Sequence, residues 1–168
     1  MNQTETGTYR IVVDTSKQEL HLFADGQRMK TYAISTGKNG IGELSGSEKT
    51  PRGQHYIRAK IGAGKPANTV FVGRRDTGEV FSETLRETHP DRDWILTRIM
   101  WLCGCEPGFN RGGNVDTMRR YIYIHGSPDA DEMGKPGSHG CIKMKNQDVV
   151  ELFDLVPAGT TVTIDEGS

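Results

Sequence analysis

Short runs of alternating apolar and polar residues, separated by turn sequences, limit what this chain can fold into more than any other feature. Apolar side chains fall on or near one face of three successive runs that begin at Tyr9: Ile11 and Val13; Leu20 and Leu22; Met29, Tyr32 and Ile34. A period of two is typical of β-strands with one buried face. Asp25-Gly26, between the second and third runs, is a hairpin signal. The opening of the chain therefore predicts an antiparallel meander.

The rest of the chain extends this β-rich pattern. The 21 Gly and 7 Pro in 168 residues favour many turns between short strands. This length suits one domain, so we expect a single domain over residues 1–168 with a flexible N-terminus at residues 1–8.

Later segments predict two further strands, one helix and a closing strand. Residues 94–102 fit both a helix face and a buried strand, and their β-branched and aromatic content favours the strand. A short strand is expected over residues 120–125. Asn146 is expected to cap a helix whose apolar face is formed by Val149, Leu152, Phe153 and Val156, before a last strand at residues 161–164.

Charge and hydropathy indicate which partners to expect. Lys and Arg number 21 against 22 Asp and Glu, and the basic residues are scattered, so a nucleic-acid partner is not expected. No apolar run approaches the roughly 18 residues of a membrane span, so no membrane partner is expected either. The pairs Arg74-Arg75 and Arg119-Arg120 are interpreted as solvated charges, with contact to a substrate carboxylate as the alternative.

The N-terminus and the cysteines bear on localisation. Met1-Asn2-Gln3 begins a segment without the basic start or apolar run of a secretory signal. We therefore expect a cytoplasmic protein, or a periplasmic one if a leader has been trimmed. Three cysteines are too few, and odd in number, for a disulfide framework, which agrees with a reducing compartment and leaves a thiol free for chemistry.

The residues that carry chemistry lie around Cys141. A thiol attacks carbonyls as the thiolate, which an imidazole generates or stabilises. His139 shares a face with Cys141 in extended backbone, whereas His125 reaches it only through the fold. Gly137 and Gly140 flank Ser138-His139 and permit a tight backbone whose amides converge on an oxyanion.

This pattern resembles a known family. Ser138-His139-Gly140-Cys141-Ile142-Lys143-Met144, preceded by Ile124-His125-Gly126 with sixteen residues from His125 to Cys141, is similar to the signature of the L,D-transpeptidase (YkuD-like) catalytic domain. The resemblance covers nearly the whole chain and includes Thr50-Pro51-Arg52-Gly53. It implies a mainly antiparallel β-sandwich with one or two short helices.

The resemblance also implies a role for each site residue. Cys141 is the nucleophile, His125 is its base, and the Gly126 carbonyl orients the imidazole. The amides of Gly140 and Cys141 form the oxyanion hole, and Ser138 and His139 shape the pocket. Lys143 stands where the family usually has Arg or Asn, so it is expected to bind the substrate with a charge but without the planar fork of arginine.

The implied substrate is a peptidoglycan stem tetrapeptide or a muropeptide. Cys141 would attack the bond between the L-centre of the diamino acid and D-alanine and form a thioester, with no metal or organic cofactor. Resolution by water makes an L,D-carboxypeptidase of murein recycling, which the missing signal segment favours. Resolution by an amine makes a transpeptidase that forms 3-3 cross-links or exchanges D-amino acids. Acylation by carbapenems is also implied.

Other interpretations remain open. A non-catalytic murein-binding module would keep the pocket without turnover, and a thiol peptidase acting on proteins would fit the Cys and His without the signature. Cys103 and Cys105 are interpreted as loop thiols rather than a metal site. His21, His55 and His89 are expected at the surface, and Asp93 counts as an ordinary charge unless the fold brings it near Cys141. The sequence indicates no oligomeric state.

Overall fold

A computed structural model describes residues 8–167, so the flexible terminus expected at residues 1–8 lies, except for Thr8, outside the described residues. The elements in chain order are β1 (Tyr9–Asp14), β2 (Glu19–Ala24), β3 (Gln27–Ser35), β4 (Gly53–Ile61), β5 (Thr69–Val72), β6 (Arg75–Val80), α1 (Glu83–Thr88), β7 (Ile95–Gly104), the 3-10 turn η1 (Gly113–Val115), β8 (Tyr123–Gly126), β9 (Ile142–Met144), α2 (Asn146–Leu155) and β10 (Thr161–Asp165). The mainly β prediction with one or two short helices is confirmed.

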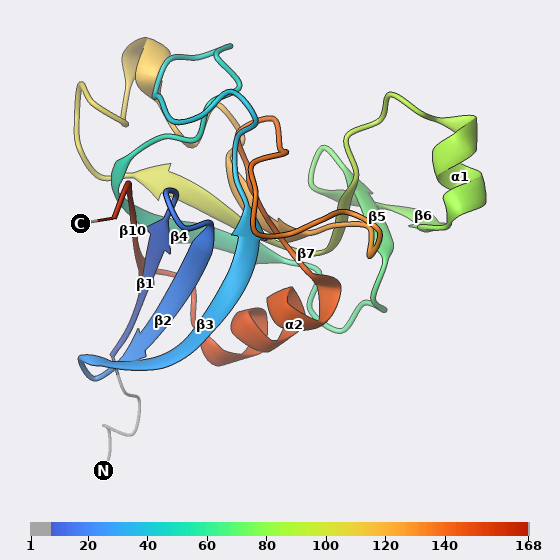
Figure 1. The fold of residues 1–168 in the computed structure, drawn as a ribbon, viewed down its shortest axis with the longest axis horizontal. Helices are drawn as coiled ribbons and strands as arrows, with labels where there is room; N and C mark the ends of the chain where they lie inside the picture. Colours follow the sequence, from blue (N-terminus) through green and yellow to red (C-terminus); the bar gives the residue numbers. More distant parts are fainter. Residues whose placement is uncertain (1–7, 168) are drawn as a thin grey trace.

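The strands form one sheet that closes on itself. Their order is β4-β10-β1-β2-β3-β9-β8-β7-β5-β6, and β4 also pairs with β7, which joins the two ends of the eight-stranded part. Most pairs are antiparallel, while β1–β10 and β8–β9 are parallel. The closed sheet is the main body in Figure 1, with β1, β2 and β3 on one side and β4 and β7 on the other.

The predicted alternation places the core. Ile11, Val13, Leu20 and Leu22 are fully buried, and α2 packs against β7 and β8 with Val149 and Leu152 buried. Met29 is an exception, since 46% of it is exposed. The pairing of β2 with β3 shifts register between Leu22 and Phe23. The first half of β3, which contains Met29, extends beyond the core.

Asn146 was expected to cap α2, and this prediction is wrong. Lys145 holds the cap position without a side-chain hydrogen bond. The Asn146 side chain is turned inward, where Thr97 Oγ1 donates to its Oδ1 and its Nδ2 donates to Asn68 Oδ1. The strand expected over residues 120–125 begins later, at Tyr123, because residues 118–121 form a turn.

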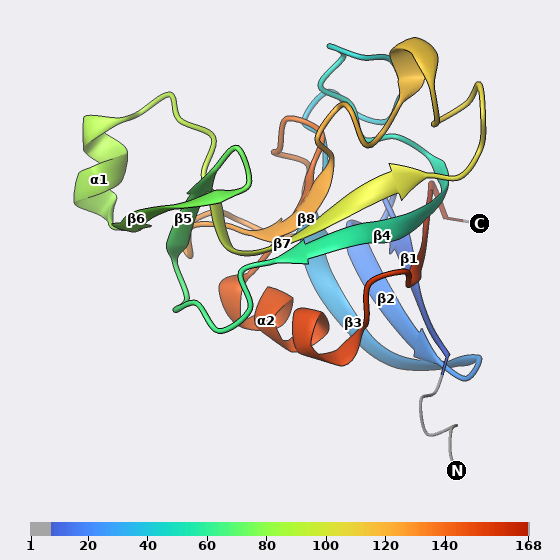
Figure 2. The same ribbon diagram turned by 180° about the vertical axis from the view of Figure 1, so that it is seen from behind.

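A hairpin and a helix project from one side of the body and were not predicted. β5 and β6 form the hairpin, and α1 follows with Ser82 as its N-cap, whose Oγ accepts from the Leu85 amide at 3.1 Å. Figure 2 shows this projection from behind. It lies on the side where β7 begins and β8 ends. β6 is almost entirely exposed, so its sequence lacks the alternation that reveals a strand.

Three surface or loop assignments are corrected. His55 is completely buried on β4 and His21 is 7% exposed, whereas His89 is exposed as expected. Cys103 is a buried residue of β7 rather than a loop thiol, and the exposed Cys105 directly follows the strand. None of the helices in residues 8–167 has the length and apolar character to cross a membrane.

Candidate active site

Three neighbouring strands bring the predicted site residues to one face of the sheet. In the parallel β8–β9 pair, His125 lies opposite Lys143, and in the β7–β8 pair Trp101 lies opposite Tyr123. Side chains two positions apart on a strand share a face, so Tyr123 and His125 share it with Cys141 and Lys143. His125 is thus a diagonal neighbour of Cys141, and residues 127–140, between the end of β8 and Cys141, form the return loop.

The Cys141 thiol lies between two backbone groups. The Tyr123 amide donates to Sγ at 3.3 Å, and Sγ donates to the Tyr121 carbonyl at 3.4 Å. Burial raises the pKa of Cys141 to about 12, although the Tyr123 amide and the Arg120 charge act in the opposite direction. Cys141 is therefore a thiol rather than a thiolate near neutral pH.

His125 is held in one tautomer. It is 1% exposed, and its Nδ1 lies 2.6 Å from the Gly126 carbonyl oxygen. A carbonyl only accepts, so Nδ1 carries the proton and Nε2 keeps its lone pair. Burial lowers the pKa of His125, which keeps the ring neutral. A neutral imidazole with a free Nε2 can take a proton from a thiol as that thiol attacks.

Gly126 fits its position because it has no side chain. A Cβ there would clash with Asn146 Oδ1 and would lie 2.7 Å from the Leu96 carbonyl oxygen. Thr97, beside it, has the unusual φ of 75°, and its hydroxyl also accepts from the Asn68 amide at 2.9 Å. Sequence reasoning missed this close packing of Asn146 and Thr97 around Gly126, because Asn146 is interpreted there as a helix cap.

Hydrogen bonds fix the loop before Cys141. Ser138 Oγ donates to the Cys141 carbonyl at 2.5 Å and accepts from the Gly140 amide at 3.0 Å. Thr50 Oγ1 donates to the Gly140 carbonyl at 2.8 Å and accepts from the Gly37 amide at 2.8 Å. Because the Gly140 amide is already engaged, its predicted role in an oxyanion hole requires that bond to be released.

Lys143 and His139 have partners of their own. Lys143 Nζ lies 2.7 Å from Asp131, which also binds Arg86 at 2.8 Å. His139 is largely exposed, with Nδ1 3.2 Å from Glu48. For Lys143 to bind substrate, as predicted, it has to exchange Asp131 for the ligand.

A cleft of about 500 Å³ opens beside the thiol. Its lining consists of Gly73, Arg74, Asp93, Ile95, Arg120, Tyr121, Ile122, Tyr123, His139 and Cys141. The structure thus brings Arg74 and Arg120, interpreted from the sequence as solvated charges or contacts to a substrate carboxylate, and Asp93, interpreted as an ordinary charge, to Cys141. Within residues 8–167, no cluster of three or more His, Cys, Asp or Glu side chains is arranged to hold a metal ion.

Arg120 is a fixed charge in this cleft. Its guanidinium donates to the carbonyls of Gly42 and Glu43 at 3.3 Å and of Lys49 at 2.5 Å. A Cβ on Gly140 would be 3.7 Å from Arg120 Nη2, so the guanidinium lies next to the backbone that carries Cys141.

Comparison with known proteins identifies the family. The model of the L,D-transpeptidase catalytic domain, YkuD, matches residues 8–164. The chain belongs to this family. YkuD of Bacillus subtilis (strain 168) is 28% identical over 156 residues, which cover 93% of this chain and 65% of that protein. YqjB of the same organism is 29% identical over 158 residues, which cover 92% and 69%. The chain thus spans about two thirds of these relatives.

Solved structures agree on the fold. L,D-transpeptidase 3 from Mycobacterium tuberculosis superposes with a TM-score of 0.60 at 17% identity, covering 95% of this chain and 62% of that one. The LD transpeptidase LdtMt1 in complex with imipenem gives 0.56 at 18% identity, covering 95% and 59%. At these identities the likeness concerns the fold. It is the sheet of this fold that aligns Cys141 with His125.

Proposed function

We propose that this member of the L,D-transpeptidase family transfers the acyl group of a peptidoglycan stem tetrapeptide through a thioester on Cys141. The bond that breaks joins the L-centre of the diamino acid to D-alanine. The proposal is supported by a thiol beside an open cleft and, on the same face of the β8–β9 pair, a buried imidazole whose Nδ1 contacts the Gly126 carbonyl. Family membership supports the choice of substrate.

The proposed reaction has two half-reactions. Sγ attacks the amide carbonyl while His125 Nε2 takes the thiol proton, and the resulting oxyanion is met by backbone amides of the Cys141 loop. The C–N bond then breaks, and the imidazolium returns the proton to the departing D-alanine amine. In the second half, His125 removes a proton from water or an amine, which attacks the thioester and restores the thiol.

Water and an amine lead to different products. Water yields the tripeptide, as an L,D-carboxypeptidase does, and we propose this outcome as the main one. The amine of a second stem peptide yields a 3-3 cross-link, and a free D-amino acid yields an exchanged tetrapeptide.

Mass spectrometry of a murein tetrapeptide incubated with the protein tests this proposal, with and without excess D-methionine. Loss of alanine in both conditions supports hydrolysis, and a D-methionine adduct supports transfer to amines. Cys141→Ala should abolish both products. His125→Gln should slow them by about 10²- to 10⁴-fold, whereas His139→Gln should keep most of the rate. Absence of any Cys141-dependent product, with binding retained, would favour a murein-binding module instead.

Carbapenem acylation follows from the same chemistry. LdtMt1 has been solved in complex with imipenem. We propose that Cys141 attacks the β-lactam carbonyl of a carbapenem in the same way as the stem-peptide amide, and that this attack opens the β-lactam ring. Intact-mass measurement should then show one added imipenem on the wild-type protein and none on Cys141→Ala.

A further inference from the structure

The tip of the β5–β6 hairpin directs an arginine over the Cys141 cleft. Val72 pairs with Arg75, so Gly73 and Arg74 form a two-residue turn, with φ of 57° and 65°. Such a turn needs positive φ at both central residues and normally takes Gly, Asn or Asp there. An arginine at the second position carries a conformational cost, and in this conformation its side chain lines the cleft.

Aromatic rings support the Arg74 guanidinium. Its carbon lies 4.5 Å from the centroid of Trp101 and 4.9 Å from that of Tyr121. Nη1 donates to the Tyr123 hydroxyl at 3.1 Å. These contacts fix the plane of the guanidinium and use one of its five N–H donors.

Tyr123 links this guanidinium to the nucleophile. Its backbone amide contacts Cys141 Sγ, and its hydroxyl contacts Arg74. The Arg74 guanidinium and the Cys141 thiol therefore lie at opposite ends of the same tyrosine. In a peptide attacked at its last amide, the terminal carboxylate carbon lies three bonds beyond the attacked carbon, roughly 4 Å away. A carboxylate at that distance can meet Arg74 while the carbonyl meets Sγ.

Charge partners distinguish Arg74 from three other arginines of the chain and from Arg120. Arg52, Arg86 and Arg92 each hold a carboxylate in an ion pair. In the described part of the chain, Arg74 has no such partner. Arg120, the second arginine of the cleft, already donates to three backbone carbonyls. Arg74 thus keeps the planar fork that matches a carboxylate, which Lys143 lacks.

We propose that Arg74 binds a substrate carboxylate next to the bond that Cys141 attacks, an inference that rests on the proposed function. Two groups next to the attacked bond offer this chemistry: the terminal carboxylate of D-alanine and the side-chain carboxylate of diaminopimelate. The reach of three bonds favours D-alanine.

Binding to a catalytically silent protein tests the proposal independently of turnover. Calorimetry would measure the Kd of the tetrapeptide for Cys141→Ala alone and combined with Arg74→Gln, Arg74→Lys or Arg75→Gln. Arg75 is the matched control, because it is the adjacent exposed arginine on β6. We expect Arg74→Gln to raise Kd by about tenfold or more, Arg74→Lys to raise it less, and Arg75→Gln to leave it unchanged.

Altered ligands identify the carboxylate. A tetrapeptide ending in D-alaninamide should bind weakly and be insensitive to Arg74→Gln if the terminal carboxylate is the partner. If Arg74→Gln instead leaves the Kd of a lysine-containing tetrapeptide unchanged, the partner of Arg74 is the side-chain carboxylate of diaminopimelate. Equal Kd values for Arg74→Gln and Arg75→Gln, or equal losses on the acid, the amide and the lysine-containing ligands, would overturn the inference. Missing turnover by the wild type, with this binding pattern intact, would overturn the proposed function alone.

Discussion

Burial of Cys141 favours its protonated thiol form. The pKa of about 12 comes from burial, and Arg120 lowers it from an even higher value. The thiolate is the species that alkylating agents attack. We predict that iodoacetamide modifies Cys141 about ten times faster for each pH unit between pH 7 and 10, without a plateau. Peptide mapping separates Cys141 from Cys103 and Cys105.

The same measurement tests the contribution of Arg120. Removing a positive charge near a thiol raises its pKa, so Arg120→Gln should slow alkylation of Cys141 several-fold at pH 9. Arg120→Lys keeps the charge and should restore part of the rate. A plateau of the wild-type rate near neutral pH would show that the thiolate is already formed in the free protein, contrary to this account.

Individual residues differ in how well the sequence revealed them. Cys141 and His125 stand in a motif with fixed spacing, and the structure places them on one face. Arg74 and Asp93 carry no motif, since their place in the cleft depends on a hairpin and a loop that pair with distant strands. Charges of this kind become informative only once the fold is known.

At the scale of elements, the end of β8 is held against the start of α2. Asn146 Oδ1 and the Leu96 carbonyl oxygen occupy the space that a Cβ on residue 126 would need. We predict that Gly126→Ala lowers the free energy of unfolding by about 1–3 kcal/mol, because backbone has to move to admit the methyl group. It should also reduce Cys141-dependent turnover, since the Gly126 carbonyl orients His125. Urea unfolding and tetrapeptide turnover measure the two effects.

Gly137→Ala is the control for this prediction. A Cβ at Gly137 meets Ser35 Oγ at 3.2 Å, the end of a side chain rather than backbone. Its effect on stability should therefore be smaller. Equal stability and turnover of Gly126→Ala and the wild type would show that β8 tolerates the methyl group and that the Asn146 contact does not position His125.

Elements whose apolar residues recur with a regular strand or helix period were predictable from the sequence, and elements without such a period were not. β1 and β2 alternate as expected because one face of each is buried. β6 and α1 have little buried surface, so no period marks them, although Ser82 was an available capping signal. Asn146 is wrongly predicted as a helix cap because the same amide suits a cap and a buried network.

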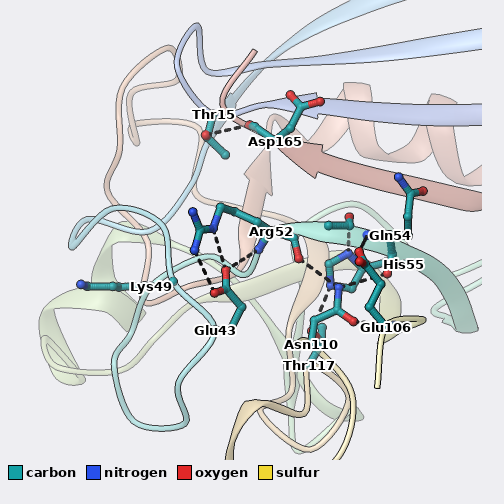
Figure 3. A network of polar contacts seen from close by, with 12 residues as sticks. Thr15, Glu43, Lys49, Arg52, Gln54, His55, Glu106, Asn110, Thr117 and Asp165 are labelled. Carbon is teal, nitrogen blue, oxygen red and sulfur yellow. Dashed lines mark hydrogen bonds and ion pairs between the residues drawn. The ribbon is translucent and has the colours of Figure 1, made fainter. Parts of the chain in front are cut away.

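At the scale of the molecule, a polar network joins β4 to the loop that leads to the cleft. Figure 3 shows His55 bonded to Thr117, and Asn110 bonded to the carbonyls of Arg52 and Gln54. His55 Nε2 lies 3.0 Å from Thr117 Oγ1, and Nδ1 lies 3.0 Å from the Gly53 carbonyl. This loop continues to Arg120 and Tyr121, so the network supports the cleft from behind.

The buried His55 makes stability depend on pH. Burial lowers the pKa of His55 to about 4 from 6.5, so between these values the unfolded chain binds more protons than the folded one. Stability due to this group is complete above pH 6.5 and decreases as the pH falls toward 4, by about 3 kcal/mol in total. Urea unfolding at pH 7 and pH 4.5 measures the loss.

Variants assign this loss to His55. His55→Gln should be less stable at pH 7 but should lose less on acidification than the wild type, whereas the exposed His89→Gln should follow the wild type. Parallel losses for His55→Gln and the wild type would contradict the assignment. The sequence alone suggested a surface position for His55, because nothing near it in the chain shows that the loop at residues 105–117 covers it.

The proposed function depends on a thioester between Cys141 and the acyl group of the L-centre of a stem peptide. The most direct test is acid quenching of the wild-type protein within seconds of mixing with tetrapeptide, followed by intact-mass measurement and peptide mapping. The account predicts an adduct on Cys141 with the mass of the tetrapeptide less D-alanine, and none on Cys141→Ala. Release of D-alanine by both proteins, with no adduct on the wild type, would contradict it.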